Sequence, residues 1–190
     1  MKCALCSEKK CREGKDCFGI TEEISYKGYD LESMKAAAAI ESEYYMQKTR
    51  LEELILFSQQ MGYEKLGIAF CVGLEKEAEL IQKILEQDFD VYSVCCKVCG
   101  IEKSEYGLKK LNPDKYDPTC NPLGQAMMLA KNDTQLNIIV GLCMGHDIIF
   151  TQNSKAPVTT LIVKDRVLGH NPAAAIYSGY HLKKRFGLDS

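Results

Sequence analysis

The chain has 190 residues, of which 46% are hydrophobic and 26% are charged, a composition typical of a folded globular protein and not of a disordered one. The formal net charge of −2 supplies no positive field for a phosphate backbone, so DNA and RNA are not expected partners. The sequence shows no apolar leader and no run of about 18 apolar residues. We therefore expect a cytoplasmic protein that does not enter a membrane.

Cysteine is unusually frequent, with ten residues in the chain. Cytoplasmic thiols are kept reduced, so a disulfide framework is not the expected use of these residues. Metal binding or redox chemistry becomes the leading interpretation.

Four of the cysteines, Cys3, Cys6, Cys11 and Cys17, fall within the first 17 residues. A C-x2-C pair lets two sulfurs bind one centre from a single tight turn, and two further thiolates complete a tetrahedral set. We predict a metal-binding module over residues 1–22, followed by an α/β domain over residues 23–190. A zinc ion and a [4Fe-4S] cluster both accept four thiolates, and the spacing does not decide between them.

A long helical pattern begins at Asp30 and continues through Ser58, until Gly62 ends it. The alanines at 36–39 allow close helix packing, and we interpret this helix as part of the core or as the face of a homodimer.

The middle of the chain alternates apolar strands with amphipathic helices. Strands are predicted at 65–72 and 89–94 with a helix over 74–87 between them, which makes a parallel, right-handed βαβ unit. Further strands are predicted at 135–140 and 158–163. The sequence therefore predicts an α/β fold with a mostly parallel sheet of about four strands and helices on both faces, in a Rossmann-like or flavodoxin-like three-layer arrangement.

Two Asn-Pro pairs predict helix starts. Asn121 and Pro122 suit the N-cap and the first position of a helix over 124–131, and Asn171 and Pro172 suit a final helix over 173–182. Cys120 and His170 precede these pairs. A thiol beside the unpaired N–H groups of a helix start has a lowered pKa.

The carboxyl ends of parallel strands meet at one edge of a sheet, where ligands bind. The cysteines that follow the predicted strands or precede the predicted helices are expected to converge there. Our candidates for holding a [4Fe-4S] cluster, with zinc as the alternative, are Cys71, Cys96, Cys99, Cys120 and Cys143. A cluster with one open iron could act on a small-molecule substrate, and a closed one could serve an electron-transfer partner.

Two other interpretations remain open. One is a zinc-binding protein without catalysis, and the other is a metal-free thiol-dependent enzyme in which Cys120 or Cys143 is the nucleophile and His146 is the base. The candidate catalytic side chains are His146, Asp147, His170 and Lys164. His146 and Asp147 also suit a helix cap, and the Lys164-Asp165-Arg166 cluster suits either an anionic substrate or a solvated turn.

A family resemblance rests on several of these motifs. They are the four-cysteine start, Cys120-Asn121-Pro122, the stretch 141–147 (GLCMGHD), the stretch 156–160 (APVTT), and Lys164-Asp165-Arg166 with His170-Asn171-Pro172. Together they resemble the bacterial and archaeal family of predicted metal-binding proteins known as domain of unknown function 1847. The resemblance covers nearly the whole chain. It implies metal binding and carries no known reaction with it.

Overall fold

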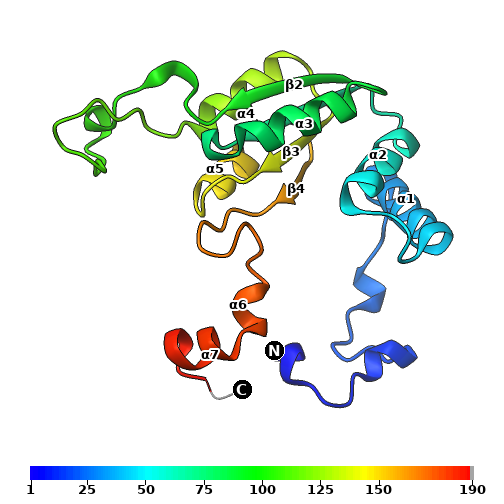
Figure 1. Cartoon of the computed structure of the whole chain (residues 1–190). Coiled ribbons are helices and arrows are strands. Elements are labelled where there is room, and N and C mark those ends of the chain that lie inside the picture. The colour runs from blue at the N-terminus through cyan, green and yellow to red at the C-terminus, as the bar shows by residue number, and fades with distance from the viewer. Residues whose placement is uncertain (189–190) are drawn as a thin grey trace. The chain divides into compact units, whose positions relative to one another are not determined.

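The computed structural model describes residues 1–188 and forms two compact units, Met1–Tyr45 and the part from Met46 onward (Figure 1). The first unit contains the short 3₁₀ helices η1 (Cys3–Leu5), η2 (Lys10–Glu13) and η3 (Thr21–Glu23), followed by α1 (Gly28–Tyr44). The second unit begins with α2 (Arg50–Gln60) and contains the sheet. Within residues 1–188, no helix is both long and apolar enough to cross a membrane.

The single long helix expected from Asp30 to Ser58 is wrong, because α1 and α2 are separate helices. Met46 has a positive φ of 58° and interrupts the helix. Thr49 then starts α2 with a capping box, in which the Glu52 N–H donates to Thr49 Oγ1 (3.4 Å) and the Thr49 N–H donates to Glu52 Oε2 (2.8 Å). The Thr-x-x-Glu signal was present in the sequence inside the apolar pattern.

The sheet has four parallel strands in the order β2-β1-β3-β4, which confirms the predicted α/β class. The strands are β1 (Lys65–Phe70), β2 (Asp90–Cys95), β3 (Leu136–Val140) and β4 (Val158–Ile162). All five residues of β3 are buried, as expected for a central strand covered on both faces.

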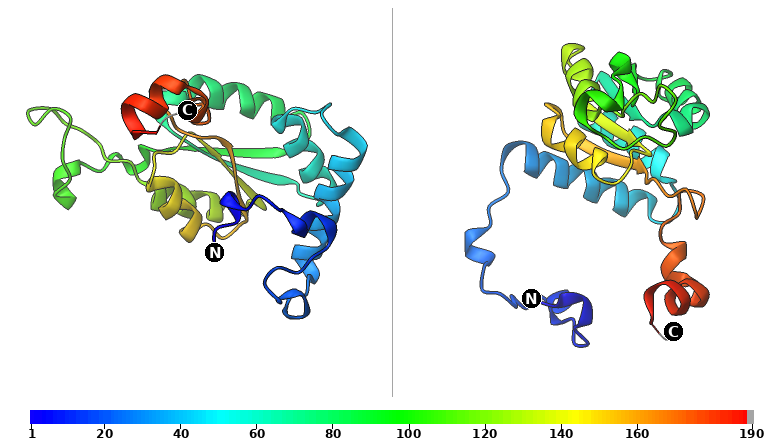
Figure 2. Two further views of the ribbon diagram at one scale, coloured as in Figure 1. Left: turned by 90° about the horizontal axis from the view of Figure 1, so that it is seen from below. Right: turned by 90° about the vertical axis from the view of Figure 1, so that its left-hand side faces the viewer.

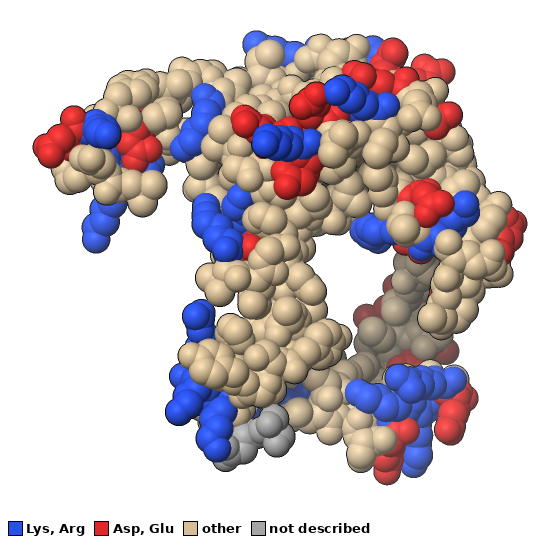
Figure 3. Space-filling model, in the orientation of Figure 1, with Lys and Arg blue, Asp and Glu red and all other residues tan. Residues whose placement is uncertain are grey.

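Helices cover both faces of the sheet. The left view of Figure 2 shows α3 (Glu75–Leu85) on one side of the strands and α4 (Pro122–Lys131) with α5 (His146–Asn153) on the other. Leu66, Ile68 and Ile138 from the strands pack with Leu129 of α4 and Phe150 of α5 in one fully buried core. Acidic and basic side chains are mixed over the outer surface of α3 (Figure 3), so this surface presents no field of one sign.

The two Asn-Pro pairs behave differently. Asn121 caps α4 as predicted, with its Oδ1 accepting from the Gly124 N–H at 2.8 Å. Asn171 caps no helix, and the expected final helix is split into α6 (Ala174–Tyr177) and α7 (Gly179–Phe186), because Ser178 is extended and its Oγ caps α7. His170, with a φ of 65°, turns the chain before the Asn171-Pro172 pair.

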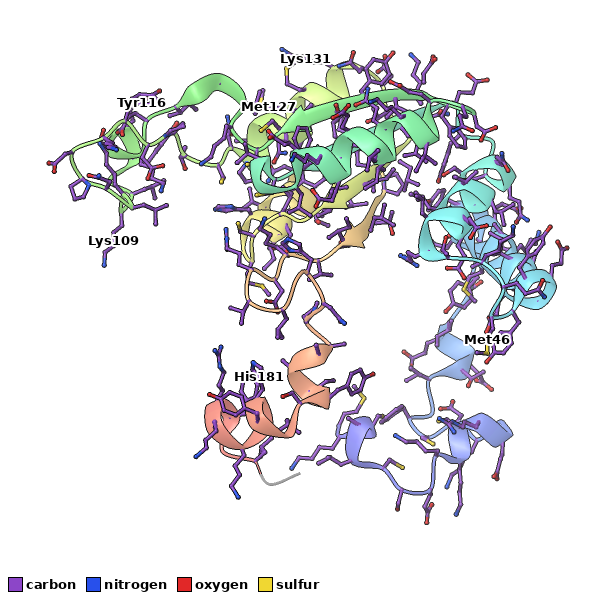
Figure 4. The ribbon with its side chains drawn as sticks, in the orientation of Figure 1. Met46, Lys109, Tyr116, Met127, Lys131 and His181 are labelled. Carbon is purple, nitrogen blue, oxygen red and sulfur yellow. The ribbon has the colours of Figure 1, made fainter. Side chains whose placement is uncertain are left out.

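The segment between β2 and α4 forms an irregular loop with two short 3₁₀ helices, η5 (Val98–Gly100) and η6 (Lys103–Tyr106). Figure 4 labels Lys109 and Tyr116 in this loop. Its two halves are joined by ion pairs between Lys103 and Asp117 (2.7 Å) and between Lys110 and Glu102 (2.8 Å). The base of the loop is therefore closed, and its two ends lie next to each other.

A small polar network lies inside the apolar core at β3. The Asn137 side chain is 1% exposed, accepts from Thr134 Oγ1 (2.8 Å) and donates to Ser154 Oγ (2.8 Å). Ser154 in turn donates to the Ala156 carbonyl oxygen (2.7 Å). The network ties the start of β3 to the turn between α5 and β4.

We predict that Asn137→Ala lowers the free energy of unfolding by about 1–3 kcal/mol, because it removes from the core the side chain that makes both of these hydrogen bonds. Urea denaturation measures this change. The matched control is Asn153→Ala on the exposed end of α5, which should shift the midpoint much less. Equal effects of the two substitutions would contradict a structural role for the network.

Candidate functional site

The strand order places a topological switch point at the carboxyl ends of β1 and β3. The chain leaves β1 toward β2 on one side and later returns to β3 on the other side, so the connections diverge between β1 and β3. In open α/β sheets such a switch point is where ligands bind. Cys71 directly follows β1, and the 141–147 stretch that contains Cys143 follows β3.

Backbone hydrogen bonds bring three cysteines together at this edge. The Cys71 N–H donates to the Val140 carbonyl (3.1 Å), and the Cys96 N–H donates to the Phe70 carbonyl (2.8 Å). The Asn121 N–H then donates to the Cys96 carbonyl (2.8 Å), which lays Cys120 beside Cys96. We call Cys71, Cys96 and Cys120 the cysteine cluster.

The side chains of the cluster contact each other. The Sγ atoms of Cys96 and Cys120 are 3.9 Å apart, within hydrogen-bonding range for sulfur, and the side chain of Cys71 is near enough to Cys96 for the two thiols to affect each other's pKa. The Val72 N–H donates to Cys96 Sγ at 3.3 Å. Cys96 is thus the central sulfur of the cluster.

The three thiols have different pKa values because they share one hydrogen-bonding system. The hydrogen bond with Cys96 is the largest influence on the pKa values of Cys71 and Cys120, and it lowers both. The pKa of Cys96 is raised by its bonds to Cys120 and Cys71 and by burial. Cys96 therefore holds its proton more strongly than its two neighbours, and Cys71 and Cys120 lose theirs more easily than ordinary thiols.

Cationic side chains from two strand ends support the thiolates. The charge of Lys97 lowers the pKa of Cys120, and that of Lys164 lowers the pKa of Cys71. Lys164 Nζ lies close over Gly73, since a Cβ atom added at Gly73 would be 3.2 Å from this nitrogen and 3.9 Å from Cys71 Sγ. The edge is therefore locally positive around its sulfurs although the whole chain is weakly negative.

Cys143 is joined to the same edge through Arg166. An Nη atom of Arg166 donates to Cys143 Sγ at 3.0 Å, and this contact raises the pKa of the guanidinium. The charges of Cys71 and Cys120 also act on Arg166. His146 is part of this neighbourhood because its charge lowers the pKa of Cys120.

Two of the candidate catalytic side chains are engaged in local turns. Asp147 Oδ1 accepts from the N–H groups of Gly145 (2.9 Å) and Ile148 (2.8 Å), as in a helix cap. His170 Nδ1 accepts from the Asp165 N–H at 3.1 Å and closes the turn after β4. A catalytic role for either residue stays a prediction.

The other candidate cysteines are exposed. Cys99 is exposed in η5 with a φ of 72°, and the four N-terminal cysteines, Cys3, Cys6, Cys11 and Cys17, are all exposed. Within residues 1–188, no group of three or more His, Cys, Asp or Glu side chains is arranged to hold a metal ion. The thiols of the cysteine cluster would have to reorient to become ligands of one ion.

Sequence reasoning missed the roles of three residues at this edge. Lys97 was not singled out, and Arg166 was considered only as part of a possible anion site, not as a partner of Cys143. Gln125 was also missed, although it is fully buried on α4 and its Nε2 donates to the carbonyls of Phe70 (3.2 Å) and Val94 (2.7 Å). This amide fixes α4 against the ends of β1 and β2. The signal in the sequence was a polar glutamine among the apolar residues of the predicted helix.

We predict that Cys120 stays reactive in mildly acidic solution. An ordinary thiol, with a pKa of about 8.5, loses about tenfold in alkylation rate per pH unit below that value. Because the pKa of Cys120 is lowered, its rate with iodoacetamide should fall much less between pH 7 and pH 6 than that of free N-acetylcysteine. Quantitative mass spectrometry of the Cys120 peptide measures the rate.

The Lys97→Met variant should show a steeper pH dependence, since loss of the positive charge disfavours the thiolate and raises the pKa. Lys131→Met is the control. Lys131, labelled in Figure 4, is the last residue of α4, whereas Cys120 lies before the start of this helix. A wild-type profile that follows N-acetylcysteine would contradict the proton-sharing arrangement.

Comparison with known proteins places the chain in a family. Residues 10–161 match the model of a family described as protein of unknown function (DUF1847). A relative in Methanocaldococcus jannaschii, described as an uncharacterized protein, is 56% identical over 188 residues, which cover 97% of each chain. No solved structure matches the chain. Both the family model and this relative cover most of the sequence, and the chain belongs to the DUF1847 family.

Proposed function

We propose that this protein binds a thiophilic metal at the carboxyl edge of its sheet, through Cys71, Cys96 and Cys120, with Cys143 as a further donor. The observation that carries the proposal is the 3.9 Å contact between the sulfurs of Cys96 and Cys120, with Cys71 beside them, at a switch point. Thiolates are the strongest protein ligands for zinc and iron. Lys97, Lys164 and Arg166 would offset the negative charge of a metal bound by several thiolates.

The sulfur geometry favours a single ion over a large cluster at this edge. Two sulfurs bound tetrahedrally at about 2.3 Å from one metal lie roughly 3.8 Å apart, close to the 3.9 Å between Cys96 and Cys120. A [4Fe-4S] cluster binds each cysteine to a different iron and needs sulfurs much farther apart. We therefore propose zinc or iron at the cysteine cluster, and a [4Fe-4S] cluster or zinc at the exposed Cys3, Cys6, Cys11 and Cys17.

In this arrangement the protein would surround the metal with charged side chains and leave one side of it open to a small molecule. Cys143, held by Arg166, and His146 are the side chains next to the cluster that could position a small molecule or move a proton. A metal, when bound, would supply Lewis-acid or electron-transfer chemistry at this edge. The substrate would be a small molecule that binds at the carboxyl ends of β1 and β3.

A metal-free thiol-dependent enzyme is the second candidate function. It is favoured by the lowered pKa of Cys120 and by the proximity of His146, which contributes to that lowering. Cys120 would be the nucleophile, and His146 the proton-transferring group. This candidate requires that the protein work without any metal.

Metal analysis after anaerobic purification separates these functions. We predict that the Cys96→Ser/Cys120→Ser double variant loses one metal equivalent per chain relative to wild type. Cys99→Ser is the matched control from the same stretch, and it should retain the full content because Cys99 lies outside the cluster. Inductively coupled plasma mass spectrometry with sulfide determination gives the metal, its amount and any iron–sulfur cluster.

Two other results of the metal analysis would contradict the proposed site. Wild-type protein without bound metal, but with a reactive Cys120, would replace the proposal with the thiol-dependent enzyme. Metal content lost only in a Cys3→Ser/Cys6→Ser variant would restrict metal binding to the N-terminal segment and contradict the proposed edge site. Circular dichroism of each variant checks that the fold is retained.

A further inference from the structure

Cys96 and Cys120 are also arranged as a pair that can be joined covalently. Their sulfurs are 3.9 Å apart although the residues are separated by 24 positions in the chain. The hydrogen bond from the Asn121 N–H to the Cys96 carbonyl, at 2.8 Å, makes the two backbone segments neighbours. A disulfide requires such closely spaced backbones, since its geometry leaves little freedom.

The loop between the two residues holds this approach in place. The Thr119 N–H donates to the Ile101 carbonyl (2.7 Å), and the Lys103 N–H donates to the Asp117 carbonyl (3.2 Å). Lys97 Nζ donates to the Pro118 carbonyl and ties the residue after Cys96 to the second residue before Cys120. The two sulfurs are therefore fixed near each other by their flanking residues on both sides.

The cysteines of the cluster differ in their access to solvent. Cys96 is 2% exposed and Cys71 is 6% exposed, whereas Cys120 is half-buried. As a residue, Cys120 is therefore the most accessible of the three to a small oxidant from solution. Sensor cysteines combine such access with a nearby resolving thiol.

We propose that Cys120 is a hydroperoxide-reactive thiol and that Cys96 traps its oxidised form as an intramolecular disulfide. The Cys120 sulfur attacks the O–O bond, which breaks as an S–O bond forms; the sulfur loses two electrons, and the second oxygen leaves as an alcohol or water after taking a proton. The Cys96 sulfur then attacks the sulfenic acid. An S–S bond forms, the S–O bond breaks, and the hydroxide leaves as water with the Cys96 proton.

The net reaction converts two thiols and one hydroperoxide into a disulfide, an alcohol and water. It needs no metal, so it goes beyond the proposed metal binding although it uses two of the same sulfurs. A bound metal would compete for these sulfurs and slow the reaction. The disulfide would in turn withdraw both sulfurs from a metal, which would make metal binding sensitive to oxidants.

The test uses the full chain, reduced and treated with a chelator, so that its outcome does not depend on metal binding. One equivalent of hydrogen peroxide is added, the remaining thiols are blocked with N-ethylmaleimide, and the protein is digested without reductant. Tandem mass spectrometry should find a peptide cross-linked between Cys96 and Cys120. The Cys95→Ser variant should give the same cross-link, which separates Cys96 from its neighbour in the same peptide.

Two variants test the assigned roles. Cys96→Ser should abolish the cross-link and leave a sulfenic acid at Cys120 that dimedone captures, while Cys99→Ser, at an exposed thiol outside the cysteine cluster, should leave the cross-link unchanged. Wild-type protein that joins Cys120 mainly to Cys71 or Cys143, or that forms no disulfide, would overturn the proposal. So would the absence of dimedone adduct at Cys120 in a folded Cys96→Ser variant.

Discussion

Parallel pairing of β1 with both β2 and β3 is the constraint on which the candidate site depends. Because β1 is the neighbour of both strands, the residues that follow all three emerge at one edge. The hydrogen bonds that extend the ladder past the strand ends then place Cys71, Cys96 and Cys120 in contact. Residues as far apart in the chain as Cys71 and Cys120 meet through the register of the sheet.

Because the thiols of the cysteine cluster lie close together, the protonation and reactivity of each one depend on the others. A buried thiol that keeps its proton makes it easier for a neighbouring thiol to lose its own, and nearby ammonium and guanidinium groups stabilise the negative charge that results. Such a group of sulfurs is suited to a metal ion, which replaces the shared proton, and to two-electron oxidation, which joins two of the sulfurs. Metal binding and disulfide formation therefore compete for the same sulfur atoms, since both use their lone pairs.

The sequence predicted the fold class well, because β-branched runs, helix periodicity and the Asn121-Pro122 cap are local signals. It also indicated that cysteines gather at the strand ends, since parallel strands have one carboxyl edge. It failed where two signals competed, as at Met46 and Thr49, where an apolar pattern continued across a helix break. The prediction that Asn171 and Pro172 start a helix was wrong, because the turn closed by Asp165 and His170 lies directly before this pair.

Which cysteines touch could not be predicted, because contact depends on strand order and on bonds between distant segments. Cys99 follows Cys96 by only three residues, yet a positive φ places it in an exposed turn. The pairing of Arg166 with Cys143 likewise links loops after two different strands. Neither composition nor spacing carries that information.

X-ray absorption spectroscopy tests the central claim most directly, in a variant with Cys3, Cys6, Cys11 and Cys17 all changed to Ser and loaded with zinc anaerobically. The account predicts three or four sulfur ligands at about 2.3 Å from the metal, since the cysteine cluster is intact. A first shell of oxygen and nitrogen alone, or no bound zinc in the folded variant, would contradict it.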